Sequence, residues 1–80
     1  MKAFNPLSIP PKGHPLVKRL FEEMNARQIT RQQLANRSGV CVDTFKSWRS
    51  KANPLITNLE ACFNSIGMEL TVKEITNELD

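Results

Sequence analysis

The apolar residues of this chain recur every three or four positions in four separate stretches, and this is the spacing of amphipathic helices. In chain order these apolar positions are Leu16, Val17, Leu20, Phe21 and Met24; Leu34 and Ala35; Val40, Phe45 and Trp48; and Leu59, Cys62, Phe63 and Ile66. The pattern predicts an all-α domain of four to five helices over residues 15–67, with an extended arm before it and a short segment after it.

Cap and breaker residues mark where these helices begin and end. Pro15 suits the first turn of a helix, and Thr30 with Gln33 forms a capping box that opens a second helix. Gly39 ends that helix because glycine takes the left-handed conformation without steric cost. Pro54 stops the third helix before Asn53. Another box, Thr57 with Glu60, predicts the start of the fourth helix, and Gly67 ends it.

The two ends of the chain have different patterns. Residues 1–14 contain three of the five prolines, which indicates an extended arm that either follows DNA through Lys2 and Lys12 or is a passive tail. Residues 68–73 alternate apolar and polar side chains, which favours a short strand. A helical stripe over Met68, Val72, Ile75 and Leu79 is the alternative.

The third helix has two chemically different faces. Phe45 and Trp48 are three positions apart and share an apolar face, so we expect Trp48 in the core. The polar positions Asp43, Lys46, Ser47 and Ser50 fall on another face of the same helix. A helix that packs on its domain while it reads a DNA major groove needs this division.

Residues 30–48 resemble the helix-turn-helix of the Cro and phage-repressor family, the xenobiotic-response-element type. The matching residues are Arg31, Gln32, Leu34, Ala35, Gly39, Val40, Thr44, Phe45 and Trp48. The likeness extends over residues 16–72. Three positions depart from the family pattern: Cys41 replaces a capping serine, Arg49 a frequent glutamate and Lys51 a frequent glycine.

This resemblance implies double-stranded DNA as the partner and assigns roles to residues of the two helices and the following loop. The candidate base contacts are Val42, Asp43, Lys46 and Ser47. The candidate phosphate contacts are Arg31, Gln32 and Thr44, together with Lys51 and Asn53 in the following loop. Three alternatives stay open: Asp43 as a favourable charge at a helix start, Lys46 as a phosphate contact, and a solvated loop at Lys51 and Asn53.

The charge distribution agrees with this assignment. The chain of 80 residues has a net charge of +3. Residues 27–53 contain Arg27, Arg31, Arg37, Lys46, Arg49 and Lys51 against Asp43 alone, whereas residues 54–80 contain Lys73 against Glu60, Glu69, Glu74, Glu78 and Asp80. The basic charge therefore lies on the proposed reading segment, as phosphate binding requires, although a solvated basic surface has the same composition.

Other classes of function have no support in the sequence. No apolar run approaches the length of a membrane span, and the N-terminus lacks the apolar core of a signal peptide. Cys41 and Cys62 are expected to be small buried side chains in a reducing, cytoplasmic setting. We find no spacing typical of a metal site, no cofactor motif and no catalytic constellation, so we do not expect an enzyme.

The sequence thus predicts a transcriptional regulator that represses a palindromic operator as a homodimer. The expected dimer interface is an antiparallel pair of C-terminal strands, with Met68, Leu70, Thr71 and Val72 in contact. The alternative is an antitoxin with a toxin protein as its partner, since stand-alone helix-turn-helix antitoxins resemble this chain in length and in the Gly-x-Glu-Leu stretch at residues 67–70. A third reading is an interaction module without DNA binding.

Overall fold

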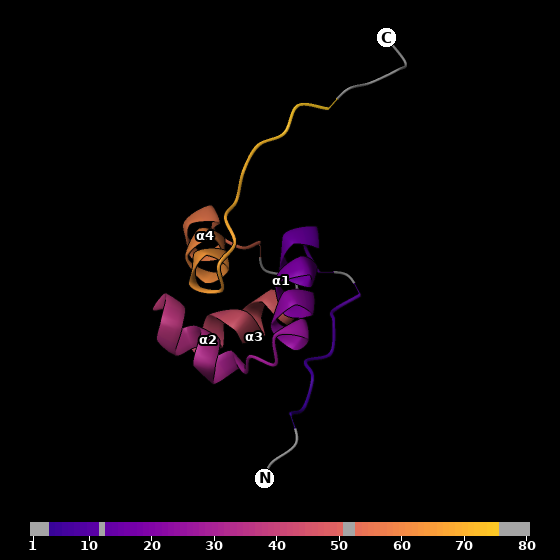
Figure 1. Cartoon of the computed structure of the whole chain (residues 1–80). Coiled ribbons are helices and arrows are strands. Elements are labelled where there is room, and N and C mark those ends of the chain that lie inside the picture. The colour runs from indigo at the N-terminus through magenta and orange to yellow at the C-terminus, as the bar shows by residue number, and fades with distance from the viewer. Residues whose placement is uncertain (1–3, 12, 51–52, 76–80) are drawn as a thin grey trace.

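Helices account for all the regular secondary structure in the part of the chain that the computed structural model describes, residues 4–11, 13–50 and 53–75. They are α1 (Pro15–Ala26), α2 (Arg31–Ser38), α3 (Val42–Ser50) and α4 (Ile56–Ser65). Helix α2 packs against both α3 and α4, and α1 packs against α4 (Figure 1). The prediction of an all-α fold is therefore confirmed for these residues.

One apolar cluster joins all four helices. Its buried members are Val17, Leu20, Phe21, Met24, Ile29, Leu34, Val40, Phe45, Trp48, Leu59, Cys62, Phe63 and Ile66. These are largely the positions with helical spacing in the sequence, because the apolar stripe of each helix faces the common centre. The prediction that Trp48 belongs to the core is confirmed, since only 3% of its surface is exposed.

The start of α1 and the start of α2 are capped by side chains. Pro15 lies in the first turn of α1, and His14 caps that helix by accepting a hydrogen bond from the backbone N–H of Leu16 at its Nδ1 atom, over 3.0 Å. At α2, the backbone N–H of Gln33 donates to Thr30 Oγ1 over 3.1 Å, and the N–H of Thr30 donates to Gln33 Oε1 over 2.9 Å. The predicted capping box is confirmed, and it satisfies two backbone donors that a helix start leaves free.

The predicted start of α4 is wrong by two residues, because the N-cap is Leu55 and not Thr57. The helix begins at Ile56 with Leu55 at the N-cap, and no side chain caps it. The Leu59 N–H donates to the Leu55 carbonyl over 3.1 Å, so the first turn is already closed before Thr57 can act as a cap. The end of α4 agrees better with the prediction, because Gly67 takes the left-handed conformation at φ 86° just after the helix.

The N-terminal segment is extended, as predicted, but it packs against the domain. Leu7 and Ile9 lie partly buried on the core cluster, and Pro10 is buried. The Leu7 N–H donates to Asn25 Oδ1 over 2.7 Å, while Asn25 Nδ2 donates back to the Leu7 carbonyl over 2.9 Å. Residues 4–11 are therefore part of the packed structure. Lys2 and Lys12 lie outside the described residues.

Residues 68–75 contain neither the predicted strand nor the alternative helix within this single chain. A strand needs a neighbouring strand to complete its hydrogen bonds, and the described residues of one chain offer none. Met68 and Leu70 pack on the core cluster, whereas Val72 is 96% exposed and Ile75 is 85% exposed. In Figure 1 this segment leaves α4 on the side away from α2 and α3.

Candidate functional site

A short turn over residues 39–41 joins α2 and α3, so the predicted order of helix, tight turn and helix is present. Gly39 has φ 80°, in the left-handed region, and its N–H donates to the Ala35 carbonyl over 2.9 Å. The N–H of Val40 donates to Ser38 Oγ over 3.1 Å, and the N–H of Thr44 donates to the Cys41 carbonyl over 3.0 Å. These local bonds satisfy the turn and set the direction in which α3 starts.

Helix α3 has an apolar buried side and a polar exposed side. Phe45 and Trp48 are buried in the core. Asp43, Lys46 and Ser47 are exposed, and Val42 is half-buried. The four predicted base-contact residues thus lie in the first two turns of α3, on its accessible side.

An open hollow lies where this surface meets α2. It has a volume of about 450 Å³ and is lined by Gln32, Ala35, Gly39, Val40, Cys41, Val42 and Asp43. The structure therefore brings Gln32, a predicted phosphate contact, next to the predicted base contacts Val42 and Asp43. Gln32 is held from its own helix, since its Nε2 donates to Asn36 Oδ1 over 3.0 Å.

The other predicted phosphate contacts lie on different elements and differ in exposure. Arg31 is at the first position of α2 and is half-buried. Thr44 is half-buried, and Asn53 is exposed in the connection before α4. Lys51 lies outside the described residues. Arg31 and Gln32 therefore share one helix start, whereas Thr44 and Asn53 belong to different parts of the surface.

Cys41 corrects one sequence prediction. It was expected to be buried, but it is exposed at the start of α3, whereas Cys62 is buried as expected. Apolar periodicity did not separate the two, because Cys41 stands in a turn where helical spacing does not apply. The resemblance carried the better signal, since Cys41 replaces a capping serine there and such a cap is solvent-facing.

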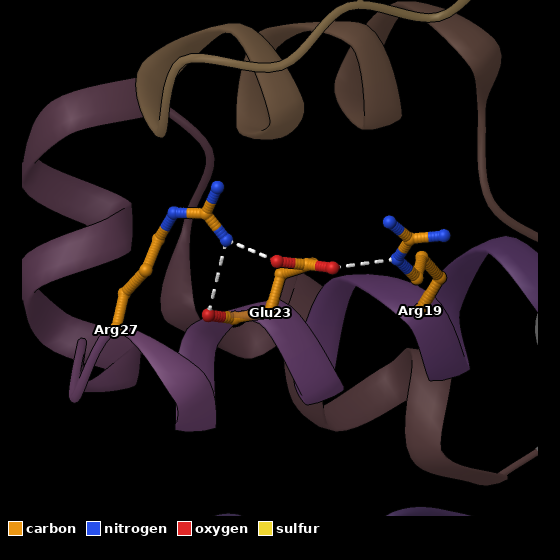
Figure 2. Close-up of polar contacts among 3 residues, drawn as sticks. All are labelled: Arg19, Glu23 and Arg27. Atoms are coloured by element: carbon orange, nitrogen blue, oxygen red, sulfur yellow. Dashed lines mark hydrogen bonds and ion pairs between the residues drawn. The ribbon is translucent and has the colours of Figure 1, made fainter.

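Ion pairs decide how much of the positive charge is available. Lys46 Nζ lies 4.0 Å from Asp43 Oδ1, and both side chains are largely exposed, so the pair is weak. Figure 2 shows Arg19 and Arg27 on the two sides of the Glu23 carboxylate; the Arg19–Glu23 distance is 2.7 Å, and Arg27 also bonds this carboxylate. Hydrogen bonds from Arg19 and then Arg27 lower the pKa of Glu23. Arg27, at the C-terminal end of α1, is therefore held by a carboxylate that it shares with Arg19, and one positive charge remains over the three side chains.

Arg49 is a residue that sequence reasoning counted among the basic charges without giving it a role. It lies in the last turn of α3, and its guanidinium donates from Nη1 to the Ser8 carbonyl over 2.9 Å and from Nη2 to Ser8 Oγ over 2.5 Å. Nothing local in the sequence signals a contact between residues so far apart in the chain.

Two classes of site find no support in the described residues. No group of three or more His, Cys, Asp or Glu side chains is placed to hold a metal ion there. None of the helices in residues 4–11, 13–50 and 53–75 has the length and apolar character to cross a membrane. Comparison of the chain with protein-family models, with curated proteins and with solved structures gives no significant match.

Proposed function

We propose that this protein is a sequence-specific DNA-binding transcriptional regulator, a repressor that places α3 in the major groove. The observation that carries the proposal is the division of α3 between Phe45 and Trp48 in the core and Asp43, Lys46 and Ser47 on the surface. A recognition helix needs this division, because one side must be fixed to the domain while the other meets base edges. A regulator of this kind acts in the cytoplasm.

The exposed groups suit major-groove chemistry. Lys46 is a donor for guanine O6 and N7, and the Asp43 carboxylate accepts from the amino group of cytosine. Val42 offers an apolar contact to a thymine methyl, and Ser47 can donate or accept. Because Lys46 and Asp43 lie 4.0 Å apart, a change at one also alters the electrostatic environment of the other.

The start of α2 suits a phosphate. Arg31 supplies a full charge, and the unpaired N–H groups at a helix start favour an anion. Gln32 lies beside Arg31, and Thr44, Lys51 and Asn53 complete the proposed set of contacts to the DNA backbone. Such contacts fix the register of the domain on DNA and contribute affinity without sequence information.

Titrations of two variants test this assignment. Lys46→Ala is expected to lower affinity for the selected operator by roughly 1–3 kcal/mol and to relax specificity at one base pair. Arg31→Ala is expected to weaken all duplexes alike and to reduce the slope of log affinity against log salt by about one unit. The operator is obtained by selecting bound sequences from random DNA. If neither variant changes binding to any duplex, the groove assignment is wrong.

The proposal includes a homodimer that joins two reading helices. Antiparallel pairing of residues 68–73 about a two-fold axis near Thr71 places Glu69 opposite Lys73 and Leu70 opposite Val72. Support comes from Val72 and Ile75, whose apolar side chains are almost fully exposed in one chain. Met68 and Leu70 already pack on their own core, so Thr71 and Val72 supply most of the new contact.

Sedimentation of the wild type and Thr71→Pro tests the dimer. Proline removes a ladder donor, so the variant is expected to be monomeric under conditions where the wild type is a dimer. Thr71→Val is the matched control, because valine keeps the backbone N–H and favours a strand. A monomeric wild type at tens of micromolar, or a dimeric Thr71→Pro, contradicts the strand pairing.

An antitoxin that represses its own operon is the second candidate. The supporting observation is the surface on the α4 side of the molecule, where Leu55 is 66% exposed and Ile56 is 63% exposed. A hollow there is lined by Leu16, Ile56, Glu60, Leu70, Thr71 and Val72. An apolar surface beside the carboxylate of Glu60 suits a basic protein partner. Neutralisation of the product of the adjacent gene on co-expression, lost in Ile56→Asp, would support this role.

A further inference from the structure

The arginines of this protein are held in two different ways. Arg19 and Arg27 both bond the Glu23 carboxylate, which compensates one of their two positive charges. Arg49 bonds Ser8, through the backbone carbonyl over 2.9 Å and through Oγ over 2.5 Å. Both acceptors are neutral, and no carboxylate in the described residues pairs with Arg49. Its guanidinium therefore keeps its full charge while its orientation is fixed.

Ser8 owes its position to contacts other than the one with Arg49. The preceding residue, Leu7, is held by the two hydrogen bonds with Asn25 at 2.7 and 2.9 Å. Of the next two residues, Ile9 packs against the core cluster and Pro10 is buried. Ser8 is thus a fixed acceptor between anchored neighbours, and it can hold a flexible arginine from outside α3.

Arg49 lies beside the exposed polar face of α3. It is three positions from Lys46 and seven from Val42, so helical spacing puts all three along neighbouring lines of the helix surface. On a recognition helix that lies in the major groove, the residues near its start meet base edges, and side chains farther along it can reach the backbone phosphates. The guanidinium has more N–H donors than its two bonds to Ser8 use, so donors remain for an anion.

We propose that Arg49 is a further contact to a DNA backbone phosphate and that Ser8 is the positioning residue that holds it ready before DNA binds. This inference rests on the proposed function. The physical gain is preorganisation: an arginine that is already ordered loses less conformational entropy when a phosphate arrives. The positive charge of Arg49 attracts the phosphate. The contact with Ser8 reduces the entropy that is lost when Arg49 binds it, so binding is tighter than for an unrestrained arginine.

The experiment measures binding to a short mixed-sequence DNA duplex over a series of salt concentrations. Arg49→Ala is expected to reduce the slope of log affinity against log salt by about one unit, because one phosphate contact is lost. Ser8→Ala is expected to leave the slope unchanged and to weaken binding roughly 2- to 12-fold, the fold-change for ordering one flexible side chain on binding. Ser8→Thr keeps the hydroxyl and is expected to restore wild-type binding.

Two further variants separate this role from a structural one. Ser8→Ala is expected to have no additional effect in the Arg49→Ala background, because the group that it positions is then absent. Arg49→Lys keeps the charge, so the slope is expected to remain while affinity falls as for Ser8→Ala; it also serves if Arg49→Ala does not fold. Arg19→Ala is the matched control, since its charge is paired on α1, and no change in slope is expected.

Each outcome has a definite meaning. A wild-type slope for Arg49→Ala, or a reduced slope for Ser8→Ala, overturns the proposal. An equal loss from Ser8→Ala in both backgrounds also overturns it, because Ser8 would then act on the fold alone. If the wild type fails to bind duplex DNA even at low salt, both the proposed function and the role of Arg49 are wrong. If Lys46→Ala and Arg31→Ala behave as expected while Arg49→Ala has no effect, only the present inference fails.

Discussion

The rings of Phe45 and Trp48 contact each other on the buried side of α3, with their centroids 5.5 Å apart and their planes inclined at 58°. Tilted aromatic pairs at such distances have favourable electrostatics in addition to the burial of their surface. This contact joins the two apolar residues that fix α3 to the core. The position of the exposed face of α3 therefore depends on this pair.

Trp48→Ala is expected to lower the free energy of unfolding by about 3–5 kcal/mol, because a large buried ring is removed from a small core. Thermal melting followed by circular dichroism measures the change. Glu22→Ala is the control, since that side chain is exposed on α1 and belongs to none of the proposed contact surfaces, so little change is expected. A melting temperature of Trp48→Ala close to that of the wild type would contradict the core role of the ring.

Gly39→Ala is expected to cost about 1–2 kcal/mol of stability, the strain of a left-handed backbone at a residue with a side chain. Gly39 has φ 80°, and an added Cβ would meet no atom within 4 Å, so the cost is backbone strain without a clash. Gly39→Asn is the control, because asparagine visits this conformation more readily. Urea unfolding of both variants is the measurement, and equal stability of the two would argue against this cause.

The Glu23 carboxylate gives a pH-dependent contribution to stability. Its pKa is lowered below the ordinary 4.5 by hydrogen bonds from Arg19 and then Arg27. A lowered folded-state pKa means that the stabilisation is present above 4.5 and is lost as the pH falls through the folded-state value. Glu23→Gln is therefore expected to be less stable than the wild type at neutral pH and to approach it at low pH. Unfolding at a series of pH values tests this, and a difference that grows on acidification refutes it.

The two cysteines are expected to differ in their reaction with iodoacetamide. Cys41 is exposed, whereas Cys62 is buried, and burial raises the pKa of the Cys62 thiol, so less of it is thiolate. Mass spectrometry should show one rapid adduct, on Cys41, and a second only on unfolding. Because Cys41 lines the hollow between α2 and α3, saturating operator DNA should slow the first reaction. Equal rates at both thiols would contradict the burial of Cys62.

Local chemistry explains which parts of the fold were predictable. The Thr30–Gln33 box and the Gly39 end of α2 depend on residues within one turn of each other, and both are present. The Thr57–Glu60 pair has the same spacing, yet the chain after Pro54 is already helical by Ile56. A threonine followed three residues later by glutamine or glutamate therefore predicts a helix start only where the chain before the threonine is not yet helical.

Contacts between distant residues explain what the sequence left open. The exposed polar face of α3 followed from helical spacing, so Asp43, Lys46 and Ser47 were placed correctly on the surface. The Arg49–Ser8 contact joins positions 41 residues apart, and no periodicity connects them. Their contact requires the packing of residues 4–11 against the domain, which proline content alone did not indicate.

The paired bonds between Asn25 and Leu7 move the boundary of the folding unit upstream of its first helix. A fragment that starts at Pro15 would keep α1 to α4. It would, however, leave the Asn25 amide without its two bonds to Leu7, and it would expose the part of the core cluster that Leu7 and Ile9 cover. The smallest autonomous piece of this protein is therefore longer than its helical portion. Fusion partners should be joined, and truncations made, ahead of residue 4, so that the two bonds between Asn25 and Leu7 are kept.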